Sequence, residues 1–209
     1  MRVALICYHK NLNSLYPLNW INQYRNSILN QTYQDFDIFE LNYGGGQERI
    51  FTNSVFVSHR FQTFVHAMNY MLDSLFQPHG YDCVFNTNCD DYYAPQRIER
   101  QLPWIEQGFD IVSSNYTIIR NEIEHEKTEF HNLDIGHNLN SQHNIVAHPA
   151  VAYSKKFWNE NRYDPNEIPY EDLKLWQRSF PHCRFKILAE NLLFYRLHKN
   201  SVCQNPTSR

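Results

Sequence analysis

The sequence is poor in glycine, and its glycines do not form a dinucleotide-binding signature. Six occur in 209 residues, three of them together as Gly44-Gly45-Gly46. No G-x-G-x-x-G follows the first apolar run, which excludes a dinucleotide-binding dehydrogenase. Because Gln47 follows the glycine run, it is not a phosphate loop of the G-K-[ST] type. We expect these glycines to give their loop the freedom to close.

Long apolar runs and a secretory signal are also missing. No stretch approaches the about 20 apolar residues that a membrane span needs. The first residues, MRVALICYHK, lack the small-residue cleavage site of a signal peptide. The five cysteines are odd in number and contain no C-x-x-C, which argues against a disulfide framework or a zinc cluster. We therefore expect a soluble, cytoplasmic protein without a membrane span.

Basic charge is not in excess either. Nineteen Lys and Arg residues stand against 22 Asp and Glu, a net charge of -3, so no nucleic-acid partner is expected. A zinc hydrolase motif of the H-E-x-x-H type is absent. The chain is instead rich in histidine, with eleven, and in aromatic residues, at 15%. This composition is compatible with metal or sugar chemistry, and the length suits one domain.

Strand-like and helix-like segments alternate along the chain. Short apolar runs typical of buried parallel strands alternate with segments of helical periodicity. Strands are expected at 3–7, 36–41, 81–86 and 109–115, and helices at 17–30, 57–76 and 95–107. The polar stretch 120–144 is expected to be an irregular or mobile loop. The pattern predicts a single α/β domain whose mainly parallel central sheet is flanked by helices.

An acidic turn, Asn88-Cys89-Asp90-Asp91, follows the third expected strand. In open α/β sheets ligands bind beyond the carboxyl ends of the strands, and carboxylates there can hold Mg²⁺ or Mn²⁺. Asp and Asn are also ordinary turn and helix-cap residues. The turn by itself therefore leaves both a metal site and a helix cap open.

Four segments in order along the chain share a family pattern. They are Asn26-Ser27-Ile28 through Gln31-Thr32-Tyr33, the acidic turn with its Tyr-Tyr-Ala-Pro and basic helix, Tyr170-Glu171-Asp172 with Leu175-Trp176 and Arg178, and Tyr195-Arg196-Leu197-His198 with Asn200-Ser201. Together they resemble family 2 glycosyltransferases with the GT-A fold, a Rossmann-like α/β fold, over about residues 2–203. The resemblance implies a nucleotide-sugar-binding half at about 1–100 and an acceptor-binding half at about 101–205.

The resemblance implies a donor site around the acidic turn. Asp90 and His198 would bind a divalent cation, for which the imidazole favours Mn²⁺ over Mg²⁺. Asp91 would orient metal-bound water or sugar hydroxyls, and Arg196 would contact the phosphates. Asn88 stands where the family has the first Asp of its D-x-D motif, and an amide there can still hydrogen-bond a ribose.

The resemblance also places the nucleotide base over the ends of the first two strands. Tyr8 and His9 would lie beside it. Asn42 stands where relatives usually carry an Asp that contacts uracil, and its amide can still accept from a uracil N–H. The donor is accordingly expected to be a UDP-sugar.

The remaining implied residues belong to the acceptor side. Asp172 matches the general base of inverting members, and Glu171 would orient its loop; both carboxylates would equally suit the first turn of the following helix. His148, Tyr92 and Tyr93 are expected on the acceptor side. Trp176 is expected in the core.

The expected function is metal-dependent, inverting transfer of a sugar from a nucleotide-diphosphate sugar to a hydroxyl of a glycan, glycoprotein or glycolipid. Two alternatives remain open. One is a sugar nucleotidyltransferase, although Tyr8-His9-Lys10-Asn11 stands where that class usually needs a Gly-rich, basic loop. The other is a non-catalytic nucleotide-sugar-binding module, which the departures at Asn88 and Asn42 suggest.

Overall fold

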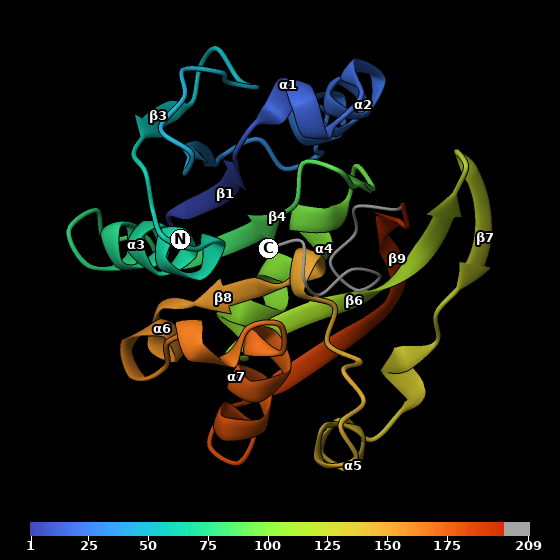
Figure 1. Ribbon diagram of the computed structural model, residues 1–209. Helices are drawn as coiled ribbons and strands as arrows, with labels where there is room; N and C mark the ends of the chain where they lie inside the picture. Colours follow the sequence, from blue (N-terminus) through green and yellow to red (C-terminus); the bar gives the residue numbers. More distant parts are fainter. Residues whose placement is uncertain (199–209) are drawn as a thin grey trace.

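A mixed β-sheet runs through the middle of the molecule, as Figure 1 shows in the computed structural model. The structure describes residues 1–198, so Asn200, Ser201 and Cys203 lie outside the described residues. Within that range the strands are β1 (Val3–His9), β2 (Asp37–Asn42), β3 (Val55–Ser58), β4 (Cys83–Thr87), β5 (Tyr92–Tyr93), β6 (Ile111–Arg120), β7 (Ile123–Lys127), β8 (Ala152–Ser154) and β9 (Phe185–Arg196). Their order is β3-β2-β1-β4-β8-β6-β9-β5, and β7 pairs with β6.

Helices cover both faces of this sheet. They are α1 (Leu12–Leu15), α2 (Leu18–Leu29), α3 (Phe64–Phe76), α4 (Arg97–Glu106), α5 (Ile135–Asn140), α6 (Lys155–Glu160) and α7 (Glu171–Ser179), with 3₁₀ turns at Phe130–Asn132, His148–Ala150 and Pro165–Glu167. Residues of α3, α6 and α7 share one buried cluster with one face of the sheet. Residues of α2 and α4 share a second cluster with the other face. The predicted α/β arrangement, a central sheet flanked by helices, is confirmed. Among the described residues, no helix is long and apolar enough to cross a membrane.

Strand direction divides the sheet into two parts. β3, β2, β1 and β4 pair in parallel, whereas β8 is antiparallel to both of its neighbours, β4 and β6. β9 returns parallel to β6. Because parallel strands end at the same edge, the ends of β1, β2 and β4 meet there, and the acidic turn follows β4.

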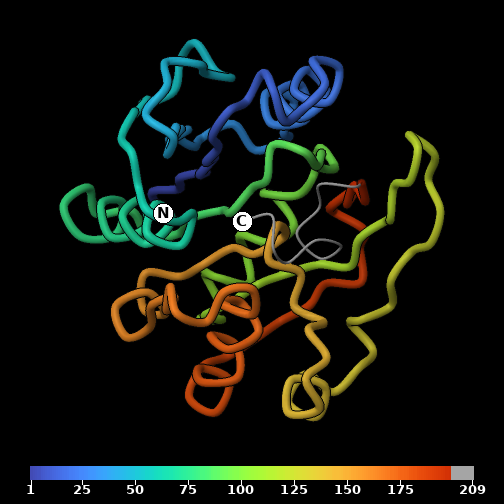
Figure 2. The backbone as a smooth tube through the Cα atoms, viewed as in Figure 1, coloured from blue at the N-terminus to red at the C-terminus, as the bar shows by residue number. Residues whose placement is uncertain are grey.

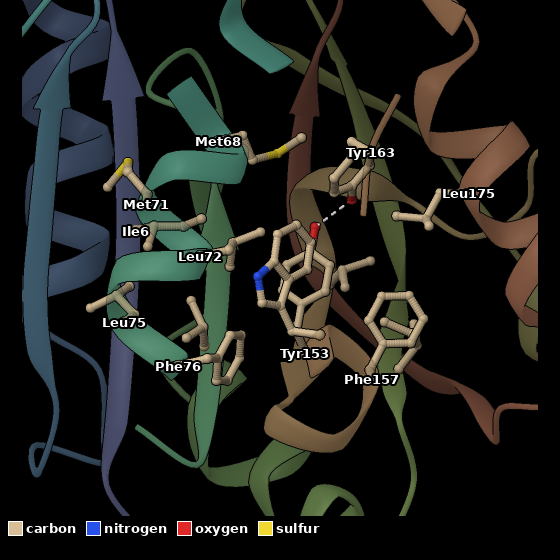
Figure 3. Close-up of a cluster of buried hydrophobic side chains, with 14 of the residues drawn as sticks. Ile6, Met68, Met71, Leu72, Leu75, Phe76, Tyr153, Phe157, Tyr163 and Leu175 are labelled. Atoms are coloured by element: carbon tan, nitrogen blue, oxygen red, sulfur yellow. Dashed lines mark hydrogen bonds between the residues drawn. The ribbon is translucent and has the colours of Figure 1, made fainter. Parts of the chain in front are cut away.

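The larger core cluster is rich in aromatic side chains. Figure 3 shows α3 residues such as Met68 and Leu72 packed toward Tyr153 of β8. The hydroxyls of Tyr153 and Tyr163 point toward each other, 2.7 Å apart. Trp176 is fully buried here, as the helical spacing predicts. Burial of each such side chain stabilises the fold by about 1.5–3 kcal/mol.

The expected helix at 57–76 is wrong in its first part. Val55–Ser58 is the edge strand β3, paired with β2, and the helix begins at Phe64 after Thr63, whose hydroxyl accepts a hydrogen bond from the His66 amide. Val55, Phe56 and Val57 are β-branched or aromatic, and such residues favour a pleated strand over a helix.

The segment 120–144 is more ordered than expected. It contains β7, a 3₁₀ turn and α5, and Figure 2 shows it as a yellow trace along one side of the molecule. All five residues of β7 are exposed, so the strand carries no apolar alternation that the sequence could reveal. Asp134 caps α5 by accepting a hydrogen bond from the His137 amide, 2.7 Å away.

Candidate functional site

The acidic turn is closed by hydrogen bonds of its own residues and by the last strand. The Asp91 amide donates to the Asn88 carbonyl at 3.3 Å, and the Asn88 amide donates to the Tyr93 hydroxyl at 2.8 Å. Tyr92 and Tyr93 form β5, which pairs antiparallel with β9. The turn thus lies between the end of β4 and the end of β9, two segments far apart in the sequence.

The two residues expected to bind a cation are close together in the structure. Nε2 of His198 lies 3.1 Å from Oδ2 of Asp90, and both side chains are partly exposed, at 11% and 21%. The ring of Trp20 on α2 packs against the His198 ring, with centroids 4.9 Å apart. Within residues 1–198 no group of three or more His, Cys, Asp and Glu residues is arranged to hold a metal ion. The Asp90–His198 pair suits a hard cation that takes its other ligands from a substrate phosphate and water.

Arg196 is buried and held by protein groups, and its expected contact with the donor phosphates stays a prediction. Its side chain is 1% exposed. The amide of Arg196 donates to Oδ1 of Asp91 at 2.8 Å, and its guanidinium donates to the Asp90 carbonyl and to Oε1 of Gln23 on α2. Nε lies 3.3 Å from Oε1 of Glu122. Arg196 therefore fastens the acidic turn to its neighbours instead of facing solvent.

Two aromatic rings complete the surroundings of Arg196. The guanidinium carbon lies 4.7 Å from the ring centroid of Trp20 and 5.3 Å from that of Tyr92. The Tyr92 ring is itself stacked on Phe194, with centroids 4.5 Å apart. Such cation–π contacts are strengthened by the exclusion of water. Tyr92 is half-buried, and its contact with an acceptor stays a prediction.

Asp91 faces the interior. Its residue is 1% exposed, and Oδ2 has no hydrogen-bond partner among the described residues. Burial raises the pKa of the Asp91 carboxyl well above its usual value, and the Asp90 charge raises it further, whereas Arg196 acts in the opposite direction. The carboxyl is buried in the structure, and its expected role in orienting water or sugar hydroxyls stays a prediction.

Tyr93, which is expected on the acceptor side, is a buried residue in the structure, and its contact with an acceptor stays a prediction. It is 2% exposed. The guanidinium carbon of the buried Arg97 lies 4.4 Å from its ring centroid. Because its hydroxyl accepts a hydrogen bond from the Asn88 amide, Tyr93 links the acidic turn to the buried core.

The end of β1 places Tyr8 and His9 in different environments, since successive side chains of a strand point to opposite faces. The Tyr8 hydroxyl donates to Oδ1 of Asn88 at 3.4 Å, beside the acidic turn. His9 is buried, and its Nε2 lies 2.9 Å from Oε1 of Glu40. The imidazole is buried against Glu40, and the expected contact of His9 with a nucleotide base stays a prediction.

Glu40 organises the loop that follows β2. Its carboxylate accepts hydrogen bonds from the amides of Ile50 and Phe51 and, at 3.1 Å, from the Ser54 hydroxyl. Burial by itself would raise the pKa of Glu40, but the hydrogen bonds from His9 and the two amides outweigh it and lower the pKa.

Both polar atoms of the Asn42 side-chain amide form hydrogen bonds with the glycine-containing loop. Oδ1 accepts from the Gly44 amide at 3.0 Å, and Nδ2 donates to Oε2 of Glu48 at 3.1 Å. The residue is 1% exposed. Asn42 thus shapes the loop beside the expected base site, and its contact with uracil stays a prediction. Gly45 has a φ of 80°, a conformation that glycine adopts without strain.

The expected general base lies at the start of α7. Asp172 is half-buried, and its Oδ2 accepts a hydrogen bond from Nδ2 of Asn144 at 2.9 Å. Glu171, at the first position of α7, is 2% exposed. The catalytic roles of both carboxylates stay predictions, because a first-turn position is also favourable for the helix.

The Glu171 and Asp172 charges contribute to the raised pKa values of two tyrosines, Tyr8 and Tyr163. Burial raises the pKa of Tyr8, and the Glu171 charge contributes to the same rise, although Tyr8 is bonded to Asn88 of the acidic turn. Burial likewise raises the pKa of Tyr163, with a contribution from the Asp172 charge. The His148 ring packs edge-on against Tyr163, with centroids 5.7 Å apart, and its place on the acceptor side stays a prediction.

Several residues of the site carried no signal in the sequence. Trp20 and Gln23 lie on α2, whose sequence pattern is typical of an amphipathic surface helix. Glu122 and Asn144 lie in the polar segment 120–144. Each acts through a partner distant along the chain, so local pattern could not have found it.

Comparisons with known proteins agree with this architecture. No protein-family model matches the chain. It is 26% identical over 190 residues to the O-antigen biosynthesis glycosyltransferase WbnJ of Escherichia coli, covering 84% of this chain and 74% of that protein. It is 28% identical over 120 residues to the uncharacterized glycosyltransferase MJ1057 of Methanocaldococcus jannaschii, covering 53% of this chain and 40% of that protein.

The fold is similar to that of solved TarS structures of S. aureus. TarS 1–349 in complex with UDP superposes with a TM-score of 0.68 at 14% identity, covering 96% of this chain and 62% of that one. The UDP-GlcNAc complex gives a TM-score of 0.69 at 14% identity, covering 95% and 59%. The chain therefore spans about three fifths of these TarS chains. The chain is therefore similar in sequence to two proteins named as glycosyltransferases, and it shares its fold with the TarS structures.

Proposed function

We propose that the chain transfers a sugar from a UDP-sugar to a hydroxyl of a glycan or glycoconjugate. The observation that carries the proposal is the Asp90–His198 pair, 3.1 Å apart at the end of β4, in a fold shared with UDP-bound TarS. The adjoining Tyr8 and Asn88 supply polar groups where the donor would lie.

The proposal includes a divalent cation, with Mn²⁺ preferred over Mg²⁺. Asp90 and His198 would hold it, and the imidazole nitrogen is the reason for the preference. When bound, such a cation neutralises the negative charge that develops on the departing diphosphate.

The chain's own residues would position and deprotonate the acceptor. Asp172 takes the proton of the acceptor hydroxyl, whose oxygen forms a bond to the anomeric carbon. The bond between that carbon and the diphosphate oxygen breaks, and its electron pair leaves with the nucleotide. A single displacement of this kind inverts the anomeric configuration. Asn144, bonded to Oδ2 of Asp172, orients the carboxylate.

The test is titration calorimetry of the full chain with a panel of nucleotide sugars, with Mn²⁺, with Mg²⁺ and with EDTA, followed by assays of nucleotide release. We expect Mn²⁺-dependent binding of UDP-sugars that Asp90→Asn abolishes. Asp35→Asn is the matched control, because Asp35 is exposed and distant in sequence from the pair.

Three results would separate the alternatives. No nucleotide binding under any condition overturns the proposal. Binding without turnover, with every acceptor tried, identifies a non-catalytic module. Release of pyrophosphate from a nucleoside triphosphate and a sugar phosphate identifies a nucleotidyltransferase instead.

A further inference from the structure

The β6–β7 hairpin projects from the sheet, and one interaction at its tip reaches the donor site. Figure 1 shows the hairpin standing out beyond the neighbouring strands. Every residue of β7 is exposed, and Ile123 is 62% exposed, so burial does little to hold the hairpin in place. Its position depends instead on its pairing with β6 and on contacts made by its tip.

The tip has an unusual residue for its backbone conformation. Asn121 and Glu122 have φ angles of 50° and 62°, both in the left-handed region. Two-residue hairpin turns with positive φ at both positions favour Asn followed by Gly, because glycine has no Cβ to clash. Asn121 fits this preference, whereas Glu122 adopts a conformation that is costly for a glutamate.

The Glu122 side chain makes an interaction that a glycine could not. Its Oε1 lies 3.3 Å from Nε of Arg196, and its Oε2 accepts from Nη2 at 3.4 Å. The Arg196 side chain is 1% exposed, and the Glu122 side chain is 47% exposed. The hairpin tip thus supplies a carboxylate to a buried guanidinium.

That guanidinium also determines where the acidic turn lies. It donates to the Asp90 carbonyl, while the Arg196 amide bonds to the Asp91 carboxyl. The contacts therefore run from Glu122 through Arg196 to Asp90, whose carboxylate faces His198. Outer contacts of this kind orient the residues that bind a ligand directly.

We propose that Glu122 is a positioning residue of the donor site, which fixes the tip of the β6–β7 hairpin to the acidic turn through Arg196. The role in donor binding rests on the function proposed above, whereas the mechanical link between hairpin and turn does not. Because coupling between two sites is reciprocal, a donor that orders the turn also orders the hairpin tip.

Three variants test the proposal in the full chain. Glu122→Gln keeps the length of the side chain and removes its charge. Glu122→Gly removes the side chain and relieves the positive-φ conformation. Glu126→Gln is the matched control, because Glu126 is an exposed acidic residue of β7 in the same hairpin.

Hydrogen exchange read by mass spectrometry measures the link without any ligand. We expect Glu122→Gln and Glu122→Gly to exchange faster than the parent in peptides covering 88–93 as well as 119–127, and Glu126→Gln to match the parent at 88–93. Both variants leave the buried Arg196 without its carboxylate, so both should melt below the parent, and Glu122→Gly should melt above Glu122→Gln because glycine also relaxes the positive-φ turn.

Calorimetry with UDP and Mn²⁺ measures the consequence for the donor site. We expect both Glu122 variants to bind UDP about tenfold more weakly, and Glu126→Gln to bind like the parent. In the parent, UDP with Mn²⁺ should slow exchange at 119–127, and this protection should be lost in Glu122→Gln.

The outcomes distinguish this proposal from the proposed function. Unchanged exchange at 88–93 in Glu122→Gln overturns the link. Faster exchange at 88–93 with parental UDP affinity overturns the role in donor binding. A parent chain that binds no UDP overturns the proposed function and with it the donor-site role, and exchange at 88–93 then decides the link alone.

Discussion

The two carboxylates that the proposed reaction needs are held in contrasting ways. Asp90 belongs to a turn fastened by the buried Arg196 and supported by the buried Tyr93. Asp172 belongs to the first turn of α7, and its hydrogen-bonding partner Asn144 is exposed. The donor side is thus built into the core, whereas the base side lies against a surface segment. Substitutions on the donor side should cost stability as well as activity, and those on the base side should cost activity alone.

The largest expected effect is on the base side. Asp172→Asn should lower kcat about 10³-fold, about 4 kcal/mol in the activation barrier, because an amide cannot take the acceptor's proton. The melting temperature should stay close to that of the parent, since Asp172 is only half-buried. Steady-state kinetics and thermal denaturation measure the two quantities. Parental turnover in Asp172→Asn would show that another group removes the proton.

On the donor side, the substitution Arg196→Met should destabilise the fold. The buried guanidinium donates to the Asp90 carbonyl and to Gln23, and leaving these acceptors without their donor should cost about 3 kcal/mol of unfolding free energy. Arg178→Met is the control, because Arg178 pairs with Glu167 while 45% exposed and such pairs contribute less than about 1 kcal/mol. Urea denaturation of both variants measures the difference. Equal losses of stability would remove the contrast between the two sides.

The buried Glu40 should make donor-side stability depend on pH. Glu40→Gln should lower the unfolding free energy by about 2 kcal/mol at neutral pH, because hydrogen bonds to a carboxylate are stronger than those to an amide. The pKa of Glu40 is lowered in the folded state from its ordinary value of 4.5. Its stabilising effect is therefore present above pH 4.5 and is lost as the pH falls below that value toward the folded pKa.

Denaturation of parent and Glu40→Gln across this range supplies the measurement. The two stability curves should lie apart at neutral pH and converge in acid. If the difference in unfolding free energy stays constant down to pH 3, the charge of the Glu40 carboxylate does not stabilise the loop.

The smallest expected effect is that of Asn144→Ala. Loss of its hydrogen bond to Asp172 should lower kcat about tenfold, about 1.4 kcal/mol, without lowering stability. Asn140→Ala, an exposed neighbour at the end of α5, is the control. If both variants keep parental kcat, the segment 120–144 does not orient the base.

The sequence was informative where a pattern is repeated locally. Ile98, Leu102 and Ile105 recur at helical spacing and lie buried on α4, as predicted. The continuous apolar run at 3–7 predicted β1 in the same way. The sequence-based prediction failed at 57–58, where residues with strand preference precede a helix. It also failed in β7, where both faces are exposed and periodicity carries no information.

For the candidate site too, the sequence predicted some residues and missed others. The order of motifs pointed to Asp90 and His198, which the fold brings together although 108 positions separate them. The same reasoning could not show that Arg196, His9 and Tyr93 are buried, because residue type does not reveal which face of a strand reaches solvent. Nor could it find Trp20 or Glu122, whose positions follow from tertiary packing alone.

The bond from the Arg196 amide to Asp91 spans 105 positions of the chain. Closing a loop of that length is entropically unfavourable until other contacts have formed, so such pairings come late in folding. The acidic turn can reach its final shape only when β9 docks, at the far end of the described chain from β1. Donor-binding competence should therefore lag behind secondary-structure formation when the protein refolds, which makes it a stricter criterion of the native state than circular dichroism.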